Sequence, residues 1–453
     1  MFQSMIFKIN KNLSTQVLQL AIPAIAGLSS QMIVSLVNTS MVGRLENTHI
    51  QLAAMGLGFL GTMAITSFFS SMSTGTQVLI ARRHGENNPV GVGEVLNNSL
   101  FISIMLGLIF GSIGYFYSYN IMDFFSADEQ VTLIGADYMR YQFVGLPFFL
   151  MIVSYRGFFF GIGHTKIFMI SAIIINIFNL IFNYLFMFGA LGFPKMQLAG
   201  AGVGYTISMI IGWLFFISVT FISDYRKQYQ YYSKFNFSKE IISQIVKISL
   251  PVSVQNILIL LGFLVFVAIT GIISTIAQAA SNVVINALFL SIMPCFGFGI
   301  AAQTLVGQSI GKGSERLSNA YGFETAKLVT LYTIFIGIIF VFFPDAILTL
   351  LTKDQLVISS ARTILQIAGV AQVFYGSGII FANALQAGGA TVYVMFVEVL
   401  THWVIFLPLT YLFGVRFNGG INGAWMALPI YIVTYTLMNF LRFRSTNWLK
   451  VKL

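Results

Sequence analysis

The stretches "QVLQLAIPA" (16–24) and "QIVKISLPV" (244–252) are apolar segments of one chain that align without a gap and match Pro23 with Pro251. Two further pairs repeat in the same order: "TQVLIARRHG" (76–85) with "AQTLVGQSIG" (302–311), and "GIGHTK" (161–166) with "QAGGAT" (386–391). The second pair is 302 − 76 = 226 residues apart, and the other two pairs lie within two residues of that spacing. We conclude that the chain consists of two similar halves.

The composition is that of a protein that crosses a membrane many times. Of its 453 residues, 57% are hydrophobic and 8% are charged, and the mean hydropathy is +0.85. Soluble domains carry about 25% charged residues, so a soluble fold is excluded. Apolar runs of about 20 residues, long enough to cross roughly 30 Å of hydrocarbon, recur along the chain. The first run, 16–42, is too long for a signal peptide, so we expect it to remain as a span.

We predict an all-α polytopic membrane protein with twelve transmembrane helices. Their approximate limits are 15–43, 50–80, 93–117, 131–156, 164–189, 199–222, 241–270, 279–308, 318–344, 356–385, 391–413 and 421–441.

Basic residues are distributed unevenly between the two sides that these spans define. If the N-terminus and every second loop lie on one side, that side holds seventeen of the 24 Lys and Arg residues and the opposite side holds four. Because positive charge retains loops in the cytoplasm, we expect a multi-pass protein of the plasma (inner) membrane with both termini cytoplasmic. The net charge of +10 is then explained by membrane orientation, and no nucleic-acid partner is expected.

The longest charged connection divides the spans into two sets of six. We therefore predict an N-terminal six-helix lobe (1–222), a cytoplasmic inter-lobe linker (223–240) and a C-terminal six-helix lobe (241–453). Since six is even, both halves enter the membrane from the same face, which makes a parallel pseudo-two-fold repeat. Such repeats are typical of secondary transporters that hold the substrate between the halves.

Longer stretches resemble the multidrug and toxic compound extrusion (MATE) transporters in order and spacing over nearly the whole chain. They are "LAIPAIAGLSSQMIVSLVNTSMVGRL", "LAAMGLGF", "RGFFFGIGHTK", "NYLFMFG", "LPVSVQNILILL", "ASNVVINALFLSIMPCFGFGIAAQTLVGQSIGKGS" and "FLPLTYLFG". The resemblance implies a two-lobed bundle that alternates between inward-open and outward-open states. It also implies export of organic cations or other amphipathic compounds, driven by inward flow of H⁺ or Na⁺.

The sequence departs from this family at the acidic positions. Asn38 replaces an Asp that the family often has in the first span, in a D-x-x-x-x-G arrangement, and Asn183 replaces another in the fifth span. A Glu common in the seventh span is Ile259 here, and an Asp of the tenth span aligns with Tyr375. The usual ion-coupling acids are therefore missing.

Polar side chains form stripes along three predicted spans. Residues spaced three or four apart share one face of a helix, and the sets are Gln31, Ser35 and Asn38; Asn176, Asn179 and Asn183; and Gln278, Asn282 and Asn286. Each amide is open to two interpretations, a hydrogen-bonded link between helices or a cavity lining. For the stripes together we favour a substrate cavity, because amides donate and accept without the cost of an unpaired charge. Gln255 and Tyr375 complete the candidate cavity residues.

Glu398 is the candidate for proton or ion coupling. If the eleventh span begins near residue 391, Glu398 lies about 10 Å into it at about 1.5 Å per residue, and His402 follows at i+4 on the same face. Ionisable residues inside a membrane often mark proton or ion pathways. The alternative is a structural ion pair of Glu398 with His402 or an arginine.

The sequence therefore predicts a secondary active antiporter that exports amphipathic, cationic organic compounds in exchange for H⁺ or Na⁺. We expect no bound cofactor or metal, small organic molecules and membrane lipids as partners, and a monomer. Two alternatives stay open: a lipid-linked oligosaccharide flippase of the same superfamily, which usually needs a more basic cavity, and a passive membrane channel. With one Cys, four His and neither H-E-x-x-H nor C-x-x-C, the sequence has no catalytic motif, and we expect no enzyme activity.

Overall fold

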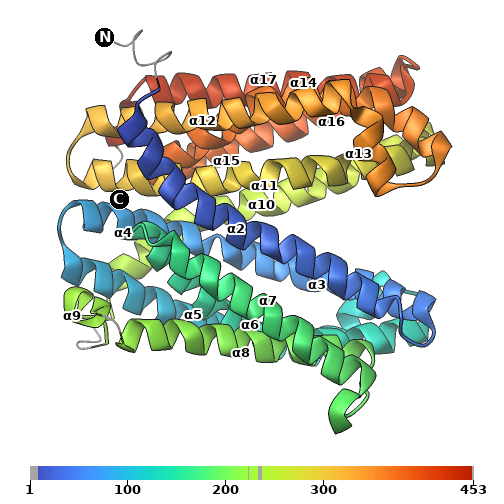
Figure 1. Ribbon diagram of the computed structural model, residues 1–453, viewed down its shortest axis with the longest axis horizontal. Coiled ribbons are helices and arrows are strands. Elements are labelled where there is room, and N and C mark those ends of the chain that lie inside the picture. Colours follow the sequence, from blue (N-terminus) through green and yellow to red (C-terminus); the bar gives the residue numbers. More distant parts are fainter. Residues whose placement is uncertain (1–8, 223, 233–236, 451–453) are drawn as a thin grey trace. The chain divides into compact units, whose positions relative to one another are not determined.

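The computed structural model of the chain describes residues 9–222, 224–232 and 237–450, and these are almost entirely helical (Figure 1). The long helices of the first half are α2 (Lys11–Val42), α3 (Thr48–Ser70), α4 (Met72–Gly85), α5 (Pro89–Phe125), α6 (Glu129–Gly161), α7 (Thr165–Phe188) and α8 (Leu198–Ile222). Those of the second half are α10 (Lys239–Ile273), α11 (Thr275–Gly311), α12 (Glu315–Phe342), α14 (Gln355–Ala387) and α17 (Gly420–Arg444), together with the eleventh span, Thr391–Arg416, which contains α15 (Thr391–Val399) and α16 (Leu407–Tyr411). Shorter helices are α9 (Tyr225–Tyr229) and α13 (Pro344–Leu351).

Within these residues, twelve helical segments are long and apolar enough to cross a membrane, which confirms the all-α, twelve-span prediction. The second span consists of α3 and α4, which meet at Ser71. The third span differs most from its predicted limits, 93–117, because α5 extends to Pro89–Phe125. At its beginning the Asn88 side chain caps the helix by accepting the Gly91 N–H at 2.9 Å, and at its end the helix continues to Phe125.

One helix lies at the centre of each half. In the first half α6 packs against α3, α4, α5 and α8, and in the second half α14 packs against α11, α12 and α17 (Figure 1). These two spans are the most buried of the twelve. Close approach to α6 depends on small residues: a Cβ on Gly107 would lie 2.4 Å from the Cα of Pro147. The matching contact pattern is what a parallel repeat predicts.

The ends of the two central helices repeat at the spacing found in the sequence. Asp128 caps α6 by accepting the N–H groups two and three residues on, at 2.8 and 3.2 Å, and Asp354 caps α14 in the same way at 2.9 and 3.4 Å. The two caps are 354 − 128 = 226 residues apart. Gly163 and Gly389 follow these helices, also 226 residues apart, with φ of 85° and 82°, a region that favours glycine.

By contact, the chain forms two compact units whose limits differ from the predicted lobes, 1–222 and 241–453. One unit is Ala26–Ser253, and the other joins Val254–Leu453 with the residues up to Ile25. The division therefore falls inside α2 and α10, just after Pro23 and Pro251. The predicted lobe limits stay a prediction about the domains.

Hydrogen bonds at the first turns of α2 and α10 give a physical reason for this division. The Asn10 N–H and the Ser14 hydroxyl donate to Glu324 Oε1 of α12 at 2.7 and 2.6 Å. The Ser238 N–H donates to Asn98 Oδ1 of α5 at 2.9 Å. Glu324 and Asn98 are 324 − 98 = 226 residues apart. In each half, therefore, a residue at an equivalent position accepts hydrogen bonds from the beginning of the other half's first helix.

The predicted linker, 223–240, is described only in part, and residues 223 and 233–236 lie outside the described residues. Its described portion contains α9, which packs against α5 and α8. The Tyr225 hydroxyl of α9 hydrogen-bonds Nδ1 of His164, the residue before α7. Tyr229 approaches the Phe158 ring edge-on, with the ring centroids 5.5 Å apart. Within the described part of the linker, α9 is therefore packed onto the first half.

The contact of α9 with His164 should weaken in acid. Burial lowers the pKa of His164 below its ordinary value, so the packed state binds a proton less readily than the released state. Protonation then favours release, and the contact should hold above about pH 6.5, the ordinary pKa of histidine, and weaken below it. We expect hydrogen-exchange protection of the α9 amides, corrected for intrinsic rates, to fall severalfold between pH 7.5 and 5.5. In His164→Gln the protection should be the same at both values; a fall of the same size in that variant would contradict the assignment.

Candidate functional site

The unit Ala26–Ser253 contains a cavity of about 330 Å³ that is lined by α2, α3, α6, α7 and α8. All six polar candidates of the first and fifth spans line it: Gln31, Ser35, Asn38, Asn176, Asn179 and Asn183. The two stripes share the cavity because the faces of α2 and α7 that carry them both border it. We call it the amide cavity.

Three asparagines form a closed group in its wall. Asn38 Nδ2 donates to Asn179 Oδ1 at 3.0 Å, and Asn183 Nδ2 donates to Asn38 Oδ1 at 2.9 Å and to Asn179 Oδ1 at 3.2 Å. The Asn183 amide can also be turned over, which lets its nitrogen donate to the backbone carbonyls of Asn179 and Ala201 at 3.2 and 3.3 Å. The group thus links α2 to α7 and keeps polar atoms at the cavity, so both interpretations of Asn38 describe part of its environment.

Gly204 of α8 makes room for this group. A Cβ at position 204 would lie 2.1 Å from Asn183 Oδ1 and 2.8 Å from the Asn183 backbone nitrogen. We therefore expect Gly204→Ala to displace the Asn183 side chain and to destabilise the protein by about 1–3 kcal/mol, as overpacking usually does. A thermal-melting comparison in detergent measures this. Gly56→Ala is the matched control, because Gly56 is a helical glycine of α3 with open space where a Cβ would lie. Gly192→Ala is unsuitable, because φ at Gly192 is +84°. An unchanged melting temperature for Gly204→Ala would contradict the packing argument.

Several lining residues of the amide cavity were not predicted. Tyr138, Gln142, Arg156 and Tyr205 all line it. Tyr138, Gln142 and Arg156 lie on α6; Tyr138 and Gln142 are four residues apart and share a helix face, a spacing that could have indicated them, whereas Arg156 lies at the end of the predicted span 131–156. Arg156 Nε donates to Ser73 Oγ at 3.2 Å, and its Nη2 donates to the Ser70 carbonyl at 3.3 Å. Both partners lie at the junction between α3 and α4.

Glu398 lies in a second polar group, within the unit that contains Val254–Leu453. Its carboxylate is buried, accepts the Tyr431 hydroxyl at 2.6 Å and accepts Gln255 Nε2 at 3.4 Å. Gln386 Nε2 in turn lies 3.5 Å from Gln255 Oε1. Among the described residues no Lys, Arg or His forms an ion pair with Glu398, so the structural ion pair considered from the sequence is not formed there. Neutral donors hold the carboxyl instead.

His402 shares this region with Glu398 but is not bonded to it. The backbone is π-helical from Leu400 to Phe406, and such wider turns change the face on which the i+4 residue lies. The His402 ring packs edge-on against Tyr431, with centroids 5.3 Å apart, and against Phe263 at 5.5 Å. Gly262 leaves the space for the ring, since a Cβ there would lie 2.3 Å from His402 Nε2.

The remaining candidates divide between this group and the surface of α11. The ring centroid of Tyr375 lies 5.9 Å from that of Tyr435 and 6.4 Å from that of Tyr431, so Tyr375 and Gln255 belong to the Glu398 group and not to the amide cavity. Asn282 and Asn286 are exposed side chains on α11, and Gln278 packs beside Gly271. The stripe of the eighth span lines neither of the two cavities described here.

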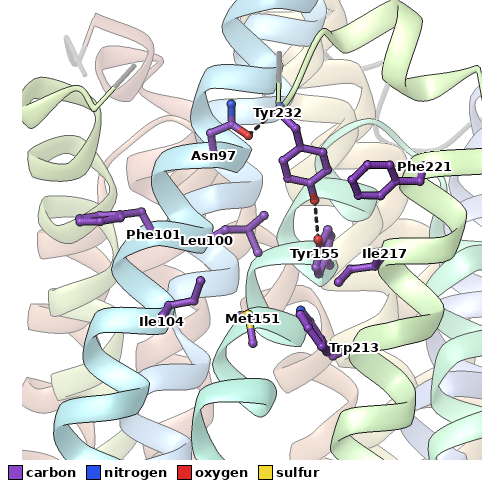
Figure 2. Close-up of a pocket in the computed structure, with 10 residues that line it drawn as sticks. All are labelled: Asn97, Leu100, Phe101, Ile104, Met151, Tyr155, Trp213, Ile217, Phe221 and Tyr232. Carbon is purple, nitrogen blue, oxygen red and sulfur yellow. Dashed lines mark hydrogen bonds between the residues drawn. The ribbon is translucent and has the colours of Figure 1, made fainter. Parts of the chain in front are cut away.

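A second cavity, of about 270 Å³, lies between α5, α6 and α8 (Figure 2). Its side chains are mostly apolar or aromatic, among them Phe101, Met151 and Trp213. Figure 2 shows Tyr232 at one end, where its hydroxyl meets that of Tyr155 at 2.5 Å. No charged residue lines it among those described.

A resident metal has no evident place in the described residues, where no three His, Cys, Asp or Glu side chains lie together. The chemistry available is therefore hydrogen bonding by amides, hydroxyls and the Arg156 guanidinium in one unit, and a buried carboxyl in the other.

Comparison with known proteins gives one consistent result. The MatE family model matches twice, at residues 23–185 and 251–412, which are equivalent parts of the two halves. "Probable multidrug resistance protein NorM" of Thermotoga maritima is 26% identical over 440 residues, covering 96% of this chain and 93% of that protein. "Uncharacterized transporter YisQ" of Bacillus subtilis is 24% identical, covering 94% and 93%.

Solved structures share the fold. A structure described as the outward-facing conformation of a multidrug resistance MATE family transporter of the MOP superfamily has a TM-score of 0.88 at 20% identity, with 98% of this chain and 97% of that chain covered. A MOP superfamily transporter from Pyrococcus furiosus also gives 0.88 at 20% identity, with 98% and 100% covered. The two-lobed, twelve-helix architecture is thereby confirmed.

Proposed function

Because this chain belongs to the MatE family, we propose that it is a secondary active transporter that exports amphipathic organic compounds by alternating access, in exchange for protons. The relative from Thermotoga maritima that is named a probable multidrug resistance protein aligns over 93% of its own length, which supports export of drug-like compounds. The observation that carries the proposal is the amide cavity, a polar site within membrane-spanning helices of one half of a two-fold repeat.

Glu398 is the proposed coupling residue. A buried carboxyl is costly as a free charge, and its described partners are a tyrosine hydroxyl and an amide. Such a site can take up and release one proton. Na⁺ is the less suitable ion, because no second carboxylate among the described residues adds an oxygen ligand beside Glu398. The cycle breaks no covalent bond and needs no bound cofactor.

The remaining parts of the proposal concern the protein in its membrane. We place it in the plasma (inner) membrane as a monomer with both termini cytoplasmic, on the basis of the positive-inside distribution. Substrates are small organic molecules and the neighbours are lipids. The resemblance to MATE transporters implies cationic substrates, but the described lining of the amide cavity contains no carboxylate to hold a cation.

Transport in proteoliposomes tests the function. A fluorescent amphipathic compound should move against its own gradient when a pH gradient is imposed and should stay at equilibrium under a Na⁺ gradient alone. A passive channel would only equilibrate the compound, and that result would overturn the proposal. Movement driven by Na⁺ alone would reassign the coupling ion.

A further inference from the structure

The charge inside the amide cavity is of one sign. Its described lining consists of apolar, aromatic, hydroxyl and amide side chains with a single charged member, Arg156, and no Asp or Glu. The two positions where related transporters often carry Asp, Asn38 and Asn183, hold neutral amides. A bound cation would find no countercharge here, whereas a bound anion would.

Arg156 has hydrogen-bonding capacity to spare. A guanidinium has five N–H donors, and two of them are used by Ser73 Oγ and the Ser70 carbonyl. Neither partner is charged, and no carboxylate among the described residues forms an ion pair with Arg156. A planar guanidinium binds carboxylate and sulfonate groups through paired hydrogen bonds.

The layout of the cavity matches an amphipathic acid. Arg156 lies five residues before the C-terminal end of α6. It is therefore on the same side of the unit as the beginning of α7. Asn183 lies near the other end of α7, eighteen residues after its beginning or about 27 Å along it at about 1.5 Å per residue. Phe149, Ile152 and Ile175 line the cavity as apolar members. An acid group at Arg156 therefore leaves an apolar body along the wall and polar substituents within reach of the amides.

We propose that the amide cavity binds amphipathic organic acids, with the acid group on Arg156, and that acids or zwitterions rather than simple cations are the exported compounds. This inference rests on the proposed export function and names its substrate class. It has an electrical consequence: outward movement of a monoanion coupled to inward movement of a proton transfers two elementary charges per cycle. Exchange of a monovalent cation for a proton would transfer none.

Binding to the purified full-length protein in detergent tests the inference without transport. The probes are 2-naphthoate, 2-naphthylmethylammonium and 2-naphthalenemethanol, which share a ring system and differ in charge. We expect the wild type to bind naphthoate at least about tenfold tighter than the ammonium. Arg156→Gln should weaken naphthoate binding by about 30-fold or more, since a truncated partner of a buried charge pair typically costs that much, and should change binding of the alcohol little. Arg156→Lys keeps the positive charge but loses the paired N–H donors of the guanidinium, so it should bind naphthoate with intermediate affinity.

Arg140→Gln is the matched control, because Arg140 is on the same helix, pairs with Asp137 at 3.0 Å and does not line the cavity. Equal affinity of the wild type for acid and ammonium would overturn the inference. So would an equal loss for all three probes in a folded Arg156→Gln, which would make Arg156 only a link to Ser70 and Ser73. If lipid is the source of the acid, phosphatidylglycerol in place of phosphatidylcholine should compete with naphthoate.

Transport separates this inference from the function on which it rests. In proteoliposomes, a potential oriented to draw positive charge in the direction of proton movement should accelerate naphthoate transport and leave that of any transported cation unchanged. Absence of transport for every probe would overturn the export function, and the binding series would still decide the charge preference.

Discussion

Glu398→Gln is expected to reduce proton-driven export to the rate of protein-free liposomes while the protein still reaches the membrane. Glutamine has nearly the shape of glutamate, so the hydrogen bond from the Tyr431 hydroxyl can persist at its present place, 2.6 Å from Oε1. An amide cannot take up and release a proton, so the exchange of substrate for a proton should stop. Transport under an imposed pH gradient, with the amount of inserted protein measured in parallel, is the readout.

Two further variants give this experiment its controls. Tyr431→Phe removes one hydrogen-bond donor but keeps the carboxyl, so export should continue with a shifted pH optimum. Glu94→Gln removes a carboxylate that pairs with Arg83 at 3.5 Å at the beginning of the third span, and export should be unaffected. Unchanged transport by Glu398→Gln would remove this residue from the coupling mechanism.

Asn38→Asp is expected to make transport depend on pH in a new way, because it adds a titratable group to a cavity whose only described charge is positive. At present Asn38 Nδ2 donates to Asn179 Oδ1 at 3.0 Å. An ionised Asp would place two oxygens in contact there, and an ionised side chain within a membrane-spanning helix is costly. The acid should therefore be protonated at low pH and disturb the amide group when it ionises.

The expected result is a new dependence of transport on pH, with acidic substrates bound about two- to fourfold more weakly at pH 8 than at pH 6, since a like charge about 20 Å from the acid group on Arg156 repels it by roughly 0.5–1 kcal/mol. Asn38→Ser, which also loses the amide but adds no charge, should bind equally at both values. Loss of folding in Asn38→Asp at every pH would favour the helix-linking role of Asn38 over the cavity role.

Much of the fold could be predicted from the sequence because membrane spans are long apolar segments that composition alone reveals. Only their ends were misjudged, as at α5, where the Asn88 cap begins the helix earlier than predicted and the helix continues to Phe125. The π-helical turns at Leu400–Phe406 could not be predicted, since they depend on packing and not on local propensity. The division of the chain inside α2 and α10 could not be predicted, since the first part of α2 packs into the apolar core of the second half and hydrogen-bonds Glu324, contacts between residues distant in sequence that no periodicity indicates.

The candidate site was predictable where polar residues repeat on one helix. The stripes on α2 and α7 line one cavity because each forms a continuous face. The stripe on α11 has the same spacing but leaves Asn282 and Asn286 exposed, so spacing alone does not identify a cavity. Arg156 and Tyr431 were missed because the importance of each comes from partners that are distant in sequence, Ser73 for Arg156 and Glu398 for Tyr431.

The central claim is that substrate export and proton entry are one coupled exchange. The most direct test measures whether a substrate gradient alone drives protons across the membrane. Proteoliposomes would contain a trapped pH-sensitive dye and equal pH on both sides, and an amphipathic acid would be added on one side only. The account predicts a pH change inside the vesicles that depends on the acid, that is absent in Glu398→Gln and that persists in Glu94→Gln. Transport of the acid with no change in internal pH would contradict it.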